Sequence, residues 1–450
     1  MSIFNFRYIS RSAGVVVLAL AGVQLHAADM AKHVVRATIA GIDVIEYPTD
    51  IKDVVTIVGS SPAGDTFAAD NIAVATLTGT LLDKGTATMD KFAIAGQLDR
   101  VGAKLGFSVG QEVLSIQARS LKADLPLVLK IMADELRHPA FTAEEFDKAK
   151  IAIEGGLQQQ AQSTDSRAAE AFNRAIFPEG HPNRPASLDE WHTALGSATL
   201  AQVKAFHEKF YGPSHMVLVV VGDLDIAKIN TELKKDFAGW SGGAPYRRAS
   251  KPAALGAPVD QTVNLAGKTS VSVFVGQATG LRFRDPDSLA LRAGAAVLGS
   301  GFTSRLLGRV RDKEGLTYSI AAGISDDTFD DGDWRIYASF APTLLDKGLA
   351  ATQRELHLWW QDGISADELA ARKTDMIGAY QVSLATTGGI AGTLLRTVQR
   401  GLPLTWMDQY PKSVDALTLD QVNGAIKRYV DPKKLVIIKS GSVIAAVPPK

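Results

Sequence analysis

The chain of 450 residues contains no cysteine, and this absence limits the chemistry open to it. Disulfides, thiolate zinc sites, iron–sulfur clusters and a cysteine nucleophile are excluded. An excess of either charge is also lacking, because 48 Lys and Arg residues balance 48 Asp and Glu residues. Nucleic-acid binding usually leaves a basic excess, so we expect no nucleic-acid partner. The length suggests roughly two to three domains.

The N-terminus has the layout of a cleavable signal peptide. Two arginines precede an apolar run at residues 14–23, and the small residues Ala27 and Ala28 follow it. A run of about ten residues is too short to cross a bilayer as a helix, although an uncleaved N-terminal anchor is the alternative reading. We therefore predict a signal peptide over residues 1–27, export to the periplasm, and a mature chain without a stable membrane anchor.

The chain repeats itself at a constant offset of 219 residues. The stretch from Asp189 to Gly222 aligns without a gap with the stretch from Asp408 to Gly441. The matched pairs are Asp189 and Asp408, Trp191 and Tyr410, Leu200 and Leu419, Gln202 and Gln421, Val203 and Val422, Phe210 and Tyr429, Pro213 and Pro432, and Gly222 and Gly441. Such a long period indicates a duplicated domain rather than a short-period solenoid.

The duplication divides the chain into two similar domains. Residues 241–258 are rich in Gly, Pro and Ala and show no helical or strand period, so we interpret them as a linker. Alternating or apolar runs predict strands at residues 54–59, 113–118, 216–221, 271–275 and 336–340. Helical periods occur at residues 127–136, 146–157, 166–176, 289–298 and 345–360.

These patterns predict an α+β fold of two homologous domains. The domains span residues 28–240 and 259–450, and each has helices packed on a mostly antiparallel sheet. Two such units joined by a linker suggest a clamshell.

The histidines do not form a helical zinc motif. None of the eight has a second histidine three or four residues away, so no helix presents two imidazoles on one face. A site assembled from distant side chains is not excluded by this argument. The acidic residues at 326–327 and 330–331 lack the spacing of a calcium loop, and a solvated turn is the better interpretation. Trp359 and Trp360 are expected in a core or an interface, and His181 in a structural role.

Residues 298–320 are the most distinctive segment of the second half. Gly299 and Gly301 predict a flexible loop, continuing to Ser304, and either Thr303 or Ser304 is suited to cap a short helix. Gly315 supplies a C-terminal stop, and a strand is expected at residues 316–320. From the residues alone, a capped helix followed by a strand explains the segment without a function for Arg311 or Tyr318.

This segment resembles the second-domain signature of the pitrilysin/insulinase family of zinc peptidases. The family pattern Arg-x-Lys-x-x-Leu-x-Tyr is matched by residues 311–318, and Ser-Arg-Leu precedes it at residues 304–306. Further matches are the stretch around His181-Pro182 and residues 139–148. The resemblance covers nearly all of the mature chain and implies paired homologous domains.

The resemblance also implies where the zinc motif of the family falls. Alignment on Lys84-Gly-Thr86 places the His-x-x-Glu-His motif on residues 76–80. Its two histidines correspond to Thr76 and Thr80, and its general base to Gly79. The third ligand corresponds to Gly156, or to Gly155 or Glu154 after a shift of one or two residues. Threonine and glycine do not hold Zn²⁺ as imidazole and carboxylate do, so we expect no metal and no cofactor on this chain.

In two-chain members of the family, one subunit carries the zinc motif and the other carries the Arg/Tyr pair. The resemblance therefore implies a non-catalytic subunit of a heteromeric zinc peptidase, with an HxxEH-bearing homologue as partner and peptides as substrates. Arg311 and Tyr318 would bind substrate and stabilise the oxyanion. The alternatives are an inert scaffold or peptide-binding protein of the same fold, and an independent enzyme with an unrecognised site.

Overall fold

A computed structural model of the chain describes residues 30–246 and 250–443. The predicted signal peptide lies outside the described residues. In the first half, strands form at β1 (Val35–Ile39), β2 (Ile42–Pro48), β3 (Val54–Ser61), β4 (Lys104–Val109), β5 (Leu114–Leu121) and β6 (Val217–Gly222). The corresponding strands of the second half are β7 (Val259–Asn264), β8 (Val271–Ala278), β9 (Thr317–Ser325), β10 (Asp333–Phe340) and β11 (Val436–Gly441).

Helices cover each sheet. Those of the first half are α1 (Ala73–Leu81), α2 (Lys91–Arg100), α3 (Leu125–Arg137), α4 (Ala143–Ala161), α5 (Thr164–Ile176), α6 (Leu188–Ser197), α7 (Leu200–Phe210) and α8 (Ile226–Asp236). Those of the second half are α9 (Ser288–Gly299), α10 (Leu345–Asp362), α11 (Ala366–Ser383), α12 (Thr387–Gln399), α13 (Trp406–Asp415) and α14 (Leu419–Tyr429), together with a π-helix, η5 (Leu307–Lys313). Every strand and helix predicted above overlaps one of these elements, and the strands predicted from residues 113, 216 and 316 begin one residue later.

The two sheets share the same order of five strands, and the first has one more edge strand, β1; this confirms the duplicated α+β fold. The first sheet has the order β1-β2-β6-β3-β5-β4, and the second has the order β7-β11-β8-β10-β9. In each sheet a single parallel pair, β2 with β6 or β7 with β11, joins otherwise antiparallel strands. The repeat also extends to local structure, since Thr199 and Thr418 begin α7 and α14 with the same capping box.

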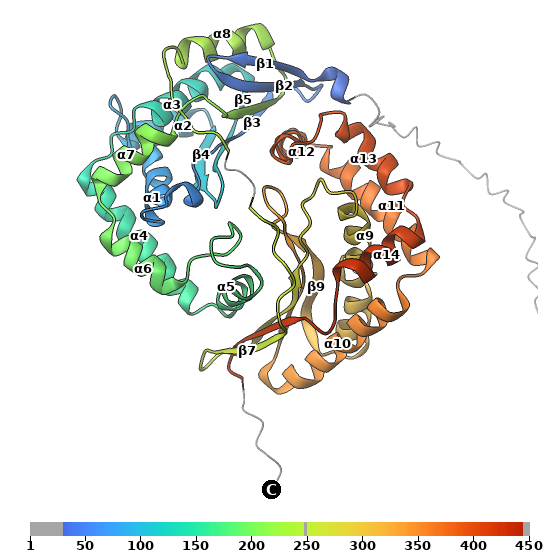
Figure 1. Cartoon of the computed structure of the whole chain (residues 1–450). Coiled ribbons are helices and arrows are strands. Elements are labelled where there is room, and N and C mark those ends of the chain that lie inside the picture. The colour runs from blue at the N-terminus through green and yellow to red at the C-terminus, as the bar shows by residue number, and fades with distance from the viewer. Residues whose placement is uncertain (1–29, 247–249, 444–450) are drawn as a thin grey trace, which may run out of the picture.

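One helix from each half packs on the sheet of the other half. Helix α5 packs on β8 and β11 of the second sheet, and α12 packs on β3 and β6 of the first (Figure 1). Phe172 on α5 lies 5.6 Å from the ring of Phe274 on β8. On the other side, the hydroxyls of Thr387 and Thr56 lie 2.8 Å apart. This exchange joins the facing halves through buried contacts.

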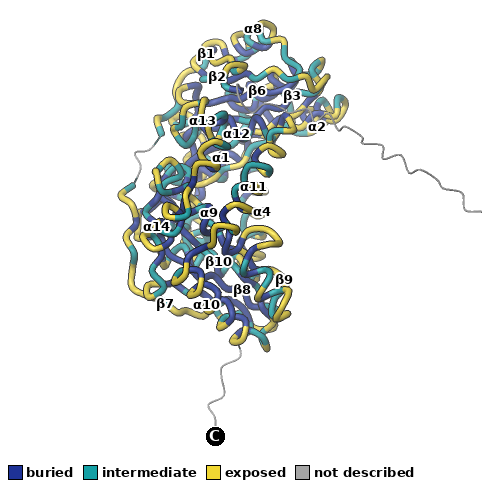
Figure 2. The backbone as a smooth tube through the Cα atoms, turned by 90° about the vertical axis from the view of Figure 1, so that its right-hand side faces the viewer, coloured by how far each residue is buried: buried dark blue, intermediate teal, exposed yellow. Residues whose placement is uncertain are grey.

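The apolar residues form a core in each half and smaller clusters between the halves. In Figure 2 the buried residues follow the central strands. One interhalf cluster combines Ile45 and Val219 from the first sheet with Ile390, Leu394 and Met407 from the second half. Among the helices in the described part of the chain, none combines the length and hydropathy needed to cross a membrane.

Candidate functional site

The positions aligned with the zinc motif lie on α1. Thr76 donates a hydrogen bond from its hydroxyl to Asp65 Oδ1 at 2.8 Å. Thr80 donates its hydroxyl to the carbonyl of Thr76, one turn earlier, also at 2.8 Å. Both hydroxyls are thus used within the protein, and neither supplies the imidazole nitrogen that zinc binds in this family.

The space next to Gly79, where the family places its general base, is already filled. A Cβ atom at this position would lie 2.3 Å from Val109 Cγ2 and 3.4 Å from Leu114 Cδ1. Both neighbours belong to the first sheet, Val109 on β4 and Leu114 on β5. A glutamate therefore does not fit here unless the side chain of Val109 moves.

The position on α4 that corresponds to the third zinc ligand also lacks a side chain free to bind a metal. Gly155 and Gly156 face open space, since a Cβ on either would meet no atom within 4 Å. Glu154 is paired with His192 of α6, whose Nδ1 lies 3.0 Å from Glu154 Oε2. Across residues 30–246 and 250–443, no group of three or more His, Cys, Asp or Glu side chains is placed to hold a metal ion. The residues present therefore do not fit the zinc centre that the family motif implies.

A partly buried carboxyl lies in this region. Asp65 lies beneath α1, and burial raises the pKa of its carboxyl to about 6, although the hydrogen bond from Thr76 opposes the shift. Tyr211 is buried nearby, and burial together with the charge of Asp65 raises the pKa of its phenol. The hydrogen bond from Thr76 and the packing around Asp65 and Tyr211 give both side chains a structural role, and neither holds a metal that would activate a water.

The two helical glycines give a matched test of this packing. We expect Gly79→Ala to lower the free energy of unfolding by roughly 1–2 kcal/mol, because the added methyl group collides with Val109. In contrast, Gly156→Ala should stabilise α4 by about 0.5–1 kcal/mol, since its Cβ enters open space and helical Gly is unfavourable. Chemical unfolding of both variants measures the difference. Equal effects at the two positions would contradict the packing argument.

In the second half, the Ser-Arg-Leu motif is part of the scaffold. Leu306 and Ser304 are buried. Arg305 makes two hydrogen bonds of 2.7 Å to the carboxylate of Glu368 on α11 and a third to the carbonyl of Gly363. These contacts fasten the segment before η5 to α11 and fix where η5 begins.

Arg311 and Tyr318, by contrast, lie at the surface beside each other. Tyr318, on the edge strand β9, is 85% exposed. The guanidinium carbon of Arg311, on η5, lies 5.1 Å from the centre of the Tyr318 ring and 5.9 Å from that of Phe302. Phe302 is 81% exposed and was not singled out from the sequence, although its place beside Gly301 is a signal. An arginine between two exposed aromatic rings presents a cation–π cluster to solvent.

The structure corrects two expectations for the loop before η5. Gly299 is the last residue of α9 rather than part of a loop, and a Cβ on it would lie 2.2 Å from the backbone of Ala322 on β9. Ser304 does not cap a helix with its side chain, because its hydroxyl donates to the carbonyl of Gly301 at 2.8 Å. The glycine stop is confirmed, since Gly315 has φ +62°.

His181 has the structural role that was expected. Its Nδ1 accepts a hydrogen bond from the amide of Asn183 at 3.1 Å, so its Nε2–H donates to Asp331 at 3.0 Å. The second carboxylate oxygen of Asp331 accepts a hydrogen bond from the amide of Ala253, in the predicted linker, at 2.9 Å. Asn183 also donates to the carbonyl of Asp331 at 2.9 Å. We call His181, Asn183, Ala253 and Asp331 the interhalf clasp.

Three residues of the acidic cluster, Asp327, Asp330 and Asp331, are buried, so the solvated-turn interpretation was wrong for them, whereas Asp326 is exposed. Asp327 pairs with Arg292, Asp330 accepts from the amide of Ser250 at 2.6 Å, and Asp331 belongs to the clasp. These three carboxylates are satisfied by protein donors, which explains how they are tolerated in a buried position. Trp359 lies in the core, where its indole stacks on Trp334 at 5.6 Å.

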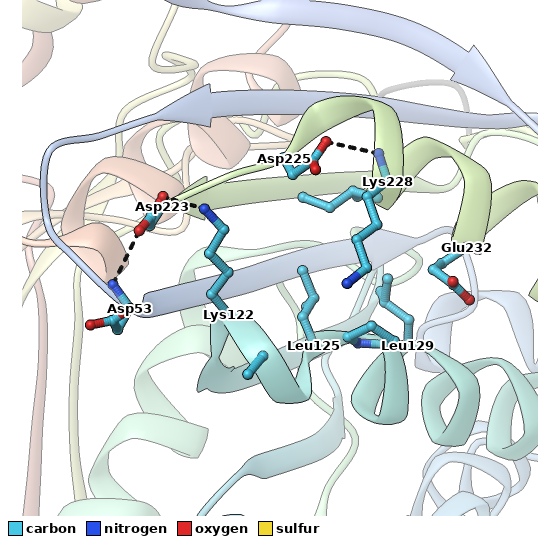
Figure 3. A pocket seen from close by; sticks show the side chains of 11 residues that line it. Asp53, Lys122, Leu125, Leu129, Asp223, Asp225, Lys228 and Glu232 are labelled. Carbon is cyan, nitrogen blue, oxygen red and sulfur yellow. Dashed lines mark hydrogen bonds and ion pairs between the residues drawn. The ribbon is translucent and has the colours of Figure 1, made fainter.

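A cavity of about 320 Å³ opens on the outer side of the first half (Figure 3). Its charges are largely paired within the protein. Lys122 Nζ lies 2.7 Å from Asp223 Oδ1, and Asp225 caps α8 through the amide of Lys228. Its eleven lining residues include no Ser, Thr or His, so it offers no nucleophile with an adjacent base.

In comparisons with known proteins, both halves match models of peptidase family M16. Residues 62–187 match the family model "Insulinase (Peptidase family M16)", and residues 197–376 match the model "Peptidase M16 inactive domain". An uncharacterized zinc protease of Streptomyces coelicolor is 26% identical over 319 residues, covering 69% of this chain and 68% of the relative.

Two solved structures show the same arrangement. The peptidase M16 inactive domain protein from Pseudomonas fluorescens superposes with a TM-score of 0.83 at 26% identity, covering 92% of this chain and all of that chain. A protease from Helicobacter pylori shares the fold with a TM-score of 0.80 at 17% identity, covering 90% of this chain and 99% of that one.

Proposed function

Because the chain belongs to the M16 (insulinase) family of peptidases, we propose that it is a non-catalytic subunit of a heteromeric zinc peptidase. Its partner in this proposal is a homologue that carries the His-x-x-Glu-His motif. Zinc held by that homologue supplies the activated water for peptide hydrolysis. The present chain supplies substrate contacts from its second half.

The observation that carries the proposal is the contrast between the two motif regions. On α1 and α4 the zinc positions hold Thr76, Gly79, Thr80 and Gly156, and Val109 fills the space of the base. On η5 and β9 the Arg311 and Tyr318 pair is present, with Tyr318 exposed and the Arg311 side chain 30% exposed. Packing within the chain does not account for Tyr318, because this side chain is 85% exposed. Its presence therefore favours a contact with another molecule.

The chemistry of the pair suits a peptide substrate. Tyr318 donates its phenolic hydrogen to the oxyanion that forms as the scissile carbonyl becomes tetrahedral. Arg311 donates from its planar guanidinium to a neighbouring substrate carbonyl, and the rings of Tyr318 and Phe302 hold that guanidinium in place. The position of Tyr318 on an edge strand gives an extended peptide access to it.

Export is part of the same proposal. We infer a periplasmic location because two arginines, a short apolar run and small residues form the first 28 positions. The partner is then expected to carry an export signal of its own.

Reconstitution tests the function directly. A quenched fluorescent peptide library is incubated with the mature chain alone, with an HxxEH-bearing homologue from the same organism alone, and with both, each with and without a chelator. We expect chelator-sensitive cleavage that is at least tenfold faster in the mixture than with either chain.

Each other outcome has a definite meaning. Cleavage by the homologue that does not change on mixing would favour the inert scaffold. Chelator-sensitive cleavage by this chain alone would overturn the assignment of Thr76, Gly79 and Thr80 to a lost zinc motif.

A further inference from the structure

A second cavity lies in the second half, between the start of α9 and helices α13 and α14. It has a volume of about 360 Å³, within the usual range of small-molecule sites. Three aromatic side chains form one wall. The Trp406 ring centre lies 5.0 Å from that of Tyr410 and 5.5 Å from that of Phe283. The three rings are inclined to one another and together give the cavity an apolar side.

Guanidinium groups gather at the same cavity. Arg284 and Arg292 line it directly. The guanidinium carbons of Arg292 and Arg400 lie 4.7 Å and 3.5 Å from the centre of the Phe283 ring. Arg292 pairs with Asp327 through one terminal nitrogen, while its Nε is buried without a hydrogen-bond partner. Burial, aided by the charges of Arg292 and Arg396, lowers the pKa of Arg400 to about 10. The charged side chains that line the cavity are two guanidinium groups and one carboxylate.

The polar groups around the cavity are mostly donors. Its acidic lining residue, Asp285, already accepts a hydrogen bond from the amide of Arg282 at 2.8 Å. The indole of Trp406 and the hydroxyls of Tyr410 and Ser413 join the guanidinium groups in the lining. A ligand that fits this set brings acceptor atoms and negative charge at one end and an apolar body at the other.

We propose that this cavity binds the carboxylate of a small organic acid with an aromatic or branched apolar body. The C-terminal residue of a peptide carries the same chemistry. The inference rests on the cavity alone and stands whether or not the chain joins a peptidase complex. Arg284 and Arg292 hold the carboxylate, and the rings of Phe283, Trp406 and Tyr410 hold the apolar body.

Calorimetric titration of the mature chain tests this assignment with matched ligands. N-acetyl-phenylalanine and its primary amide differ only in the carboxylate, and a tetrapeptide ending in phenylalanine is compared with its own C-terminal amide. We expect each free carboxylate that enters the cavity to bind at least tenfold more tightly than its amide. Binding of the small acid identifies a free acid as ligand, and binding of the tetrapeptide alone identifies a peptide terminus.

Substitution of Arg284 locates the binding. Arg284 is exposed, so Arg284→Gln is expected to leave the fold intact and to weaken carboxylate binding about 5- to 10-fold. The matched control is Arg100→Gln on α2, an exposed arginine of the other half, which should bind as the parent does. Tyr410→Phe gives a second probe of the lining. Equal affinity for acid and amide, no binding at millimolar concentration, or no effect of Arg284→Gln would each overturn the proposal.

Discussion

Tyr318→Phe is expected to reduce the turnover number of the reconstituted complex by about 10²-fold. The substitution removes one hydroxyl that donates to the developing oxyanion, a contact typically worth ~3 kcal/mol. The ring remains, so the cation–π contact of Arg311 at 5.1 Å is kept. The Michaelis constant should change little, because the contact strengthens only as the carbonyl becomes tetrahedral. Steady-state kinetics on a single cleavable peptide measure both constants.

Two controls separate catalysis from stability and assembly. Tyr318 is 85% exposed, so the variant should keep the Tm of the parent chain and elute with the partner in the same complex. Tyr47→Phe, on β2 of the first sheet, removes a hydroxyl at a position far in sequence from residues 311–318. This control variant should leave the turnover number unchanged. An unchanged turnover number for Tyr318→Phe in a complex that does cleave would favour a scaffold without a part in the chemistry.

The duplicated architecture was predictable because each repeat obeys its own local rules. An offset of 219 residues relates Val217–Gly222 to Val436–Gly441, and these segments form β6 and β11. The same offset relates the capping boxes that begin α7 and α14. Local periodicity and capping depend on neighbouring residues, so they survive in the sequence after most identities have diverged.

The exchange of α5 and α12 was not predictable in this way. The periodicity of α5 shows that one face is apolar, but it does not tell which sheet covers that face. Ion pairs between residues far apart in the sequence could not be predicted, for the same reason. Asp327 lies in an acidic run that looks solvated, and its burial depends on the ion pair with Arg292, a contact that arises only on folding.

The site shows a similar division. The motif positions Thr76, Gly79 and Thr80 followed from alignment with the family pattern, and so did Arg311 and Tyr318. Three-dimensional packing added that Val109 fills the space beside Gly79 and that Phe302 lies near the Arg311 guanidinium. Val109 and Phe302 are an apolar strand residue and a loop aromatic, which are too common in sequences to attract attention.

Asp331→Ala is expected to lower the free energy of unfolding by about 3–4 kcal/mol. The carboxylate is fully buried and accepts hydrogen bonds from His181 Nε2 at 3.0 Å and from the Ala253 amide at 2.9 Å. Removing it leaves two buried donors without partners, and the cost of each is typically ~1–3 kcal/mol. A fall in Tm of about 3–8 °C is expected for a chain of this size. Asp331→Asn keeps one acceptor oxygen and should cost roughly half as much.

The shape of the transition tests what joins the halves. Asp331→Ala breaks the interhalf clasp but leaves α5 on the second sheet and α12 on the first. If these exchanged helices couple the halves, scanning calorimetry will show one transition at a lower temperature. Asp147→Ala, at an exposed position of α4, should leave both Tm and shape unchanged. Two separate transitions in Asp331→Ala would show that the clasp, and not the exchange, makes the halves unfold together.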